Sequence, residues 1–181
     1  MLKEFKKRLI SSIILILMTF LVVLEGKTFF YIFLFIAFLI SSYEWLKMIK
    51  RADIKFLGIL FLCFSFYSAF YFRDQNLEGF LLIILICVST DIGGYIFGNF
   101  FKGPKLSKIS PNKTQSGMLG SYALSLVVSS IFVLQYSNDI YIDENLIEND
   151  LKFVILILLI SSMSQAGDLI ISYFKRSSKI K

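Results

Sequence analysis

The stretch FLLIILICVSTDIGGYIFGNFF, residues 80–101, decides the fold class of this chain. It is an apolar run long enough to cross a lipid bilayer, for which a helix needs about 20 residues, and it contains one carboxylate, Asp91. A charge costs on the order of 2.5–3.5 kcal/mol at the centre of a span, so such residues usually face a bundle interior or a wet cavity. The stretch predicts a membrane-spanning helix with a functional carboxylate, and the alternative for Asp91 is a structural hydrogen bond between helices.

Similar apolar runs recur along the whole chain. The 181 residues are 56% hydrophobic and 18% charged, with a mean hydropathy of +0.73, whereas about a quarter of the residues of a soluble domain are charged. The predicted spans are residues 9–24, 29–46, 56–72, 80–101, 117–136 and 153–174. We predict an all-α fold, a polytopic transmembrane helix bundle of about six spans that forms a single domain over residues 1–181.

The charged residues between these runs alternate from one side of the predicted bundle to the other. Most of the 19 Lys and Arg residues fall before the first span, between the second and third, between the fourth and fifth, and after the sixth. The other side carries only Lys27, Arg73 and Lys152 among many acidic residues. The positive-inside rule therefore predicts that both termini are cytoplasmic. We expect a multi-pass protein of the inner (plasma) membrane of a bacterium.

The sequence contains no histidine. This excludes histidine as a nucleophile, a general base or a metal ligand within this chain. Cys63 and Cys87 lie inside apolar runs and do not have the spacing of metal ligands, so we predict that they are small lipid-buried residues.

Small residues recur at helical spacing near Asp91. Gly94 and Gly98 form a Gly-x-x-x-Gly pattern, and the same spacing recurs in the next span at Gly117, Ser121 and Ser125. Such patterns are typical of faces where two membrane helices pack closely. Close packing would hold Asp91 in a fixed place with room beside it.

The loop KGPKLSKISPNKTQSG, residues 102–117, is rich in lysines and hydroxyl groups. Its lysines alone are typical of a cytoplasmic loop that touches anionic lipid headgroups. Ser110, Lys113 and Thr114 also stand directly before a span, where hydroxyls, an ammonium group and helix N–H groups together favour phosphate binding. The Gly-x-x-x-x-Gly-Lys-Ser/Thr spacing of a Walker-type phosphate loop is absent.

The C-terminal stretch GDLIISYFKRSSKIK, residues 167–181, places a second carboxylate, Asp168, inside the last span near its cytoplasmic end. Lys175 and Arg176 follow it. They are equally typical of a positive anchor at the membrane surface and of a phosphate site.

Taken together, these stretches resemble the phosphatidate cytidylyltransferases, also called CDP-diglyceride synthases. The resemblance covers about half of the chain, from about Ser89 to its end. Four family elements occur in order, namely Thr-Asp-x-Gly-x-Tyr at residues 90–95, Ser-Pro-x-Lys-Thr at 110–114, Gly-Asp at 167–168 and Ser-x-x-Lys-Arg at 172–176. Four elements at family-like spacing inside a polytopic bundle make a specific signal, although no single element would.

The family signature continues after Lys-Arg with four residues, Lys-Asp, a His-Gly-Gly stretch and an Asp-Arg-x-Asp stretch. In this chain residues 177–180 fill the four positions, and Lys181 matches the lysine. From this resemblance we expect a member that is truncated at its C-terminus or taken from an incomplete reading frame, with the C-terminal part of the catalytic region missing. Activity of the 181-residue chain alone is then in doubt.

The resemblance implies transfer of a cytidylyl group from CTP to phosphatidic acid, giving CDP-diacylglycerol and pyrophosphate in phospholipid biosynthesis. It implies Mg²⁺ as cofactor, held by Asp168 together with carboxylates beyond Lys181. The implied catalytic residues are Asp168, Lys175 and Arg176. The implied substrate-binding residues are Asp91, Ser110, Lys113, Thr114 and Ser172.

Three other functions stay open at this stage. A related enzyme could use CTP on another membrane lipid. An ion-coupled transporter could use Asp91 and Asp168, although no inverted repeat supports it, and a non-catalytic membrane scaffold would fit a natural truncation. We expect a lipid bilayer but no nucleic acid as partner, and the sequence is compatible with a homo-oligomer.

Overall fold

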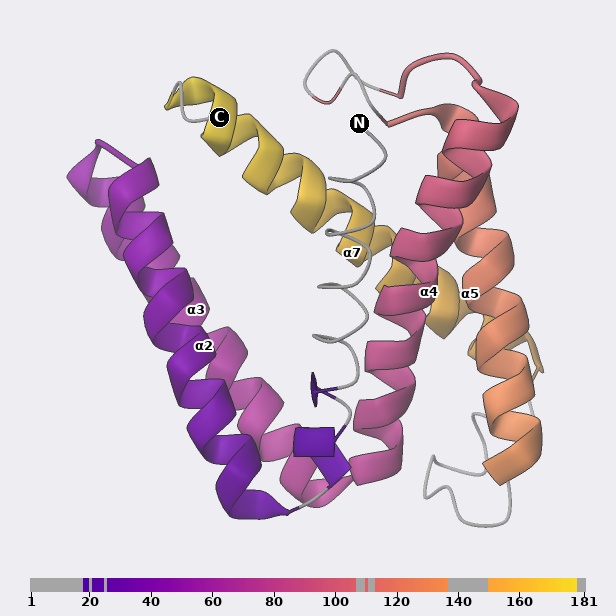
Figure 1. The fold of residues 1–181 in the computed structure, drawn as a ribbon, viewed down its shortest axis with the longest axis horizontal. Coiled ribbons are helices and arrows are strands. Elements are labelled where there is room, and N and C mark those ends of the chain that lie inside the picture. Colours follow the sequence, from indigo (N-terminus) through magenta and orange to yellow (C-terminus); the bar gives the residue numbers. More distant parts are fainter. Residues whose placement is uncertain are drawn as a thin grey trace. The chain divides into compact units, whose positions relative to one another are not determined.

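The computed structural model describes residues 18–19, 21–24, 26–106, 110, 113–136 and 150–178. Five long helices dominate it (Figure 1): α2, Lys27–Met48; α3, Ala52–Gln75; α4, Leu77–Phe101; α5, Gln115–Tyr136; and α7, Asp150–Ser177. Each is long and apolar enough to cross a membrane. No strand occurs in this part of the chain, which contains a single isolated bridge between Lys105 and Thr114. The predicted all-α membrane fold is confirmed.

The helices extend the predicted spans by a few residues. Each of the last five predicted spans lies within, or coincides at one end with, one of α2, α3, α4, α5 and α7. Of the first predicted span, residues 9–24, only 18–19 and 21–24 are described, and these are helical. The rest of that span lies outside the described residues. The cytoplasmic location of the termini stays a prediction.

The helix ends follow from local sequence. At the start of α4 the Asn76 side chain accepts a hydrogen bond from the Gly79 backbone N–H at 2.7 Å, which satisfies a donor that a helix start leaves unpaired. The same helix ends where Lys102 adopts the left-handed conformation, with φ 43°. Lys175 and Arg176 occupy the last turn of α7, where positive charge complements the helix dipole.

The chain divides into two compact units, residues 1–74 and residues 75–181. In the first unit α2 and α3 meet through aromatic side chains, for example Tyr31 on Phe70 with ring centroids 4.5 Å apart. Trp45 lies over Gly58, where a side chain would collide with the indole ring. The indole N–H also donates to the Lys55 carbonyl at 3.3 Å, so this contact joins the two helices next to their connection.

Arg73 is a buried charged residue of the first unit. It is 6% exposed, its Nη2 donates to the Val23 carbonyl at 2.9 Å, and its guanidinium lies 5.1 Å from the centre of the Phe30 ring. The bond satisfies a carbonyl near the end of the helical residues 21–24. Lys27, three residues before Phe30, forms an ion pair with Asp74, which follows Arg73 directly. Arg73 therefore joins the end of α3 to the segment that precedes α2.

The second unit consists of α4, α5 and α7. Figure 1 shows α4 and α5 side by side along their lengths, with α7 crossing them obliquely. The α4–α5 contact is close because glycines face backbone: a Cβ added at Gly93 would lie 2.6 Å from the Gly120 carbonyl oxygen, and one added at Gly117 would lie 2.7 Å from the Gly94 carbonyl oxygen. The predicted packing through small residues is confirmed. The hydrophobic core of the unit consists of Leu82, Ile86, Val133, Phe153 and Ile157.

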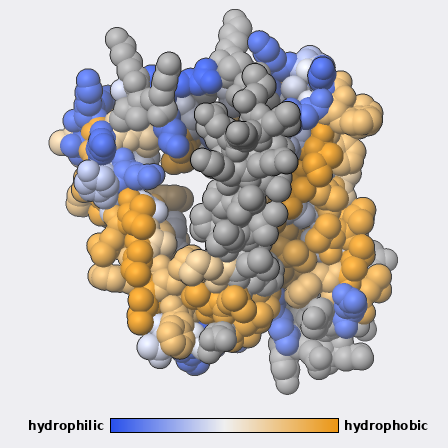
Figure 2. Space-filling model, in the orientation of Figure 1, coloured by the Kyte–Doolittle hydropathy of each residue, from blue (hydrophilic) through white to orange (hydrophobic). Residues whose placement is uncertain are grey.

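Many large apolar side chains of the described helices are exposed. Figure 2 shows hydrophobic side chains along the middle of the helices and hydrophilic ones toward their ends. Large apolar residues such as Phe61 and Phe64 on α3, and Leu134 on α5, are more than half exposed. This is the arrangement expected of helices whose surroundings are lipid rather than water.

Candidate active site

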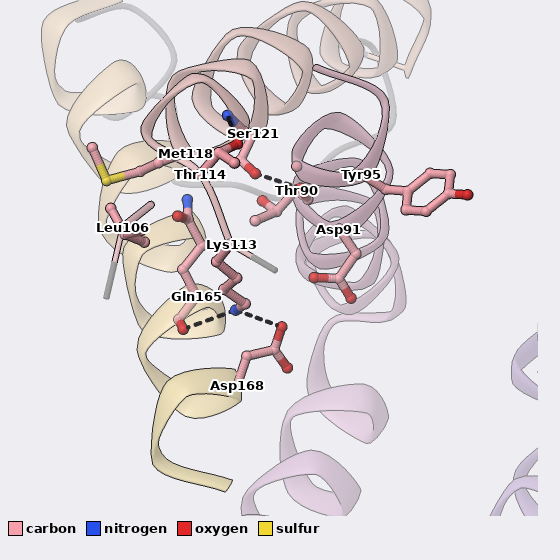
Figure 3. A pocket seen from close by; sticks show the side chains of 12 residues that line it. Thr90, Asp91, Tyr95, Leu106, Lys113, Thr114, Met118, Ser121, Gln165 and Asp168 are labelled. Carbon is pink, nitrogen blue, oxygen red and sulfur yellow. Dashed lines mark hydrogen bonds and ion pairs between the residues drawn. The ribbon is translucent and has the colours of Figure 1, made fainter. Parts of the chain in front are cut away.

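A pocket of about 220 Å³ lies in the second unit, where α4, α5, α7 and the loop before α5 meet. Figure 3 shows its lining side chains. Four predicted site residues line it, namely Asp91, Lys113, Thr114 and Asp168. They come from three separate stretches of sequence, so the fold brings together residues that belong to three different sequence motifs.

The charged groups of the pocket converge on one space. Lys113 Nζ lies 2.9 Å from Asp168 Oδ2 and donates more weakly to the Gln165 carbonyl at 3.4 Å. Figure 3 shows the Asp91 carboxylate facing the same space from α4. The Lys113 side chain is 28% exposed and that of Asp168 is 55% exposed. The pocket therefore presents two carboxylates and one ammonium group, and ligands can reach it.

The backbone of the loop fixes the position of Lys113. The Lys113 carbonyl accepts from the Leu106 N–H at 2.7 Å, its own N–H donates to the Ser110 carbonyl at 3.1 Å, and the next N–H, of Gln115, donates to the Pro104 carbonyl at 2.9 Å. These bonds fold the two ends of the loop against each other. The backbone of Lys113 is therefore fixed, and only its side chain can change its binding partner.

Thr114 has a structural task that the sequence analysis did not assign. Its Oγ1 accepts from the Gly117 N–H at 3.1 Å and lies 3.1 Å from Ser116 Oγ, which is the geometry of an N-cap for α5. Ser116 Oγ in turn accepts from the Gly103 N–H at 3.2 Å. Two of the helix-start N–H groups, those of Gln115 and Gly117, are already bonded within the protein. Phosphate binding there would depend mainly on Lys113.

Three hydrogen bonds made by hydroxyl groups join the three helices, and two of the residues involved, Thr90 and Ser121, line the pocket. Thr90 is 1% exposed and its Oγ1 donates to Ser161 Oγ at 2.9 Å, linking α4 to α7. The Thr90 carbonyl accepts from Ser121 Oγ at 2.7 Å, linking α4 to α5. A third bond, 2.9 Å between Tyr122 OH and Ser162 Oγ, links α5 to α7. Because Thr90 adjoins Asp91, these bonds set where the Asp91 carboxylate stands relative to α7.

Four predicted site residues do not line the pocket. Ser110 is buried and contributes its carbonyl to the loop. The other three, Ser172, Lys175 and Arg176, lie beyond Asp168 on α7. They follow Asp168 by four, seven and eight residues, which places them along the same side of the helix. Lys175 is about 10 Å farther along the axis, at a rise of about 1.5 Å per residue.

Asp91 and Asp168 fit a magnesium ion better than any other group in the pocket. Magnesium prefers carboxylate and phosphate oxygens and is commonly held by one or two carboxylates plus substrate phosphates. Within the described ranges, no three His, Cys, Asp or Glu residues lie close enough to hold a metal by themselves. The donor set therefore fits an ion that completes its shell with a phosphorylated substrate and water.

Sequence analysis missed several lining residues. Tyr95 and Gly94 belong to the motif around Asp91, and the sequence analysis noted that motif without assigning either residue to the site. Leu106, Met118 and Gln165 had no such signal. They belong to the pocket only because the loop folds back and α7 crosses at this level.

Comparison with known proteins found relatives along nearly the whole chain. The model of the cytidylyltransferase family matches residues 56–181. A phosphatidate cytidylyltransferase of Rickettsia typhi is 29% identical over 180 residues, which cover 96% of this chain and 77% of the relative. A phosphatidate cytidylyltransferase of Rickettsia prowazekii is 30% identical, again over 96% of this chain and 77% of the relative. One from Staphylococcus haemolyticus is 33% identical over 71% of this chain and 45% of the relative. No solved structure matched.

Proposed function

The chain belongs to the cytidylyltransferase family, and we propose that it transfers a cytidylyl group from CTP to phosphatidic acid. The products are CDP-diacylglycerol and pyrophosphate, as in phospholipid biosynthesis. The observation that carries this proposal is the convergence of Asp91, Lys113 and Asp168 on one pocket. The named relatives are phosphatidate cytidylyltransferases throughout.

The chemistry suits a site without histidine. In the reaction an oxygen of the lipid phosphate forms a bond to the α-phosphorus of CTP, and the bond from that phosphorus to pyrophosphate breaks. A phosphate monoester has a second pKa of about 6, so the attacking oxygen is already an anion and needs no strong base. The remaining difficulty is the mutual repulsion of two phosphate-bearing substrates, which fixed positive charge reduces.

Each charged residue of the pocket has a task in that reaction. Lys113 would bind phosphate oxygens of CTP, and its loop holds it at the mouth of the pocket. Asp168 and Asp91 would hold Mg²⁺. When bound there, Mg²⁺ would supply positive charge to the phosphate oxygens as negative charge develops. Asp168 would be the principal ligand because its side chain is 55% exposed, so water and nucleotide have access to it.

Ser172, Lys175 and Arg176 extend the site along α7. Their common side of the helix leads from Asp168 toward the end of the span. There a hydroxyl and two positive charges would bind phosphate, either of CTP or of the lipid. Such a row of groups would let the headgroup of phosphatidic acid reach the pocket while its acyl chains stay in the membrane.

We further propose that the site faces the cytoplasm of a bacterial cell, where CTP is made, and that the protein lies in the inner membrane. The charge asymmetry of the connecting segments supports this orientation. A fluorescent protein fused after residue 181 should therefore fluoresce, and a periplasmic reporter enzyme at the same point should be inactive. The reverse result would contradict the orientation. Homo-oligomer formation also stays a proposal, and its measurement is the mass of the protein in detergent.

The test of the proposed function is pyrophosphate release in lipid nanodiscs by the full-length protein, including any residues encoded after Lys181, with CTP, Mg²⁺ and a panel of phosphorylated membrane lipids. We expect release with phosphatidic acid, and a loss of about 100-fold or more in Asp168→Asn, because a charged group at the reacting phosphates is removed. Asp53→Asn is the matched control, since Asp53 pairs with Arg51 at the start of α3 in the other unit. Full activity in Asp168→Asn would remove Asp168 from the mechanism.

A further inference from the structure

Lys113 and Asp168 are bound to each other in this structure, although each is expected to bind something else. The ammonium group lies 2.9 Å from one oxygen of the carboxylate. It therefore occupies a position on Asp168 that a divalent cation would need. In the same way, the Asp168 carboxylate is bound to the Lys113 ammonium group, which a phosphate group would need as its partner.

We propose that this ion pair is the closed state of the site and that it opens by exchange of partners. A divalent cation replaces the Lys113 ammonium on Asp168, and Lys113 turns to the phosphates of the nucleotide. This inference rests on the proposed function and deepens it, because it states how metal and nucleotide depend on each other. No covalent bond changes in the exchange.

The structure allows this exchange without unfolding. Both side chains are partly exposed, and ion pairs with that exposure are weak. The second contact of the ammonium group, with the Gln165 carbonyl, is long at 3.4 Å. The Lys113 backbone is held by Leu106 and Ser110 independently of its side chain. The side chain can therefore change partners while the loop stays in place.

The exchange makes metal and nucleotide binding cooperative. Without metal, Asp168 neutralises Lys113, so the pocket attracts a triphosphate poorly. With metal on Asp168, both the cation and the released ammonium group face the phosphates. Two ligands that each favour the open state favour each other by the same factor. The closed pair thus disfavours the binding of CTP without its metal.

The experiment measures the CTP dissociation constant of the full chain in nanodiscs by calorimetry, first in EDTA and then with Mg²⁺. Asp168→Asn should bind metal-free CTP up to about five times more tightly than the unmodified protein, since it frees Lys113 from a pair of this strength. The same variant should gain little when Mg²⁺ is added. Asp91→Asn is the matched control, because it removes an equal charge from the same pocket and leaves the ion pair intact.

A double-mutant cycle separates exchange from a simple change in charge. If Lys113 is the released group, the tightening caused by Asp168→Asn should disappear when Lys113→Gln is also present. Equal tightening with and without Lys113, or equal tightening by Asp91→Asn, would overturn the exchange. Failure of the unmodified chain to bind CTP with Mg²⁺ would instead contradict the proposed function. Inorganic tripolyphosphate in the same variants would then decide the exchange alone.

Discussion

The close contact between α4 and α5 makes a sharp prediction for Gly93→Ala. A methyl group at Gly93 would stand 2.6 Å from the Gly120 carbonyl oxygen and 3.0 Å from Leu124 Cβ. Ordinary contact begins near 3.4 Å, so the helices would have to separate by about 0.8 Å at this point. The obstacle is mainly backbone, which moves only with the whole helix. We expect Gly93→Ala to destabilise the second unit.

The magnitude follows from two opposing effects. Replacing a glycine by alanine inside a helix gains about 1 kcal/mol of helix propensity. Forcing a methyl group into a close-packed contact costs about 1–3 kcal/mol. Gly167 on α7 is the matched control, because an added Cβ there meets no atom within 4 Å. The propensity gain is common to both variants, so the difference between them isolates the cost of the contact, about 1–3 kcal/mol.

Thermal unfolding in detergent measures this difference. For a protein of this size 1 kcal/mol corresponds to about 2–4 °C in Tm. Gly93→Ala should therefore unfold roughly 2 to 12 °C below Gly167→Ala, which itself should match or exceed the unmodified protein. Equal Tm values for the two variants would show that α4 and α5 do not meet through glycine, and the placement of Asp91 beside α5 and α7 would lose its support.

Three other predictions follow from the same structure. Thr90→Val keeps the shape of the side chain but removes the hydrogen bond to Ser161, so it should destabilise the second unit by about 0.6–1.7 kcal/mol, measured by unfolding in detergent. Thr90→Ser is the control and should retain most of the stability. An unchanged unfolding midpoint in Thr90→Val would contradict the hydrogen bond. Arg73→Met should cost about 1–3 kcal/mol, because a buried carbonyl loses its donor, and the check is the unfolding midpoint of the full chain. Replacing Lys175 and Arg176 by Gln should weaken CTP or lipid-phosphate binding and flatten its dependence on salt, whereas an unchanged salt dependence would leave them as membrane anchors only.

The apolar runs predicted most of the fold because membrane helices must be long and apolar. Their ends were harder to predict, since caps such as Asn76 and Thr114 add polar residues to the helix start. Arg73 shows the limit of charge counting. The sequence analysis counted it as a loop charge on the acidic side, whereas the structure buries it against the Val23 carbonyl.

The candidate site was predicted in its charged residues but not in their arrangement. Motif spacing identified Asp91, Lys113 and Asp168, and the pocket contains all three. Lys113 can pair with Asp168 only because α7 crosses α4 and α5 at the height of the loop before α5. No local sequence pattern indicates where along its length α7 crosses them. The hydrogen bond between Thr90 and Ser161 helps to fix this crossing point. Threonine and serine are common in these helices, so their presence alone does not predict the bond. Only the assembled helices distinguish this pair from the other serines and threonines.

The order in which the three helices are made gives the hydroxyl bonds a further meaning. A chain is synthesised from its N-terminus, so α4 and α5 are complete before α7 exists. The glycine contact lets those two helices pair early, but Thr90 and Tyr122 then lack the partners Ser161 and Ser162 that α7 supplies. Unpaired hydroxyls in lipid are costly. The hairpin of α4 and α5 thus presents hydroxyl groups whose partners only α7 supplies, and the pocket cannot form until α7 has been made.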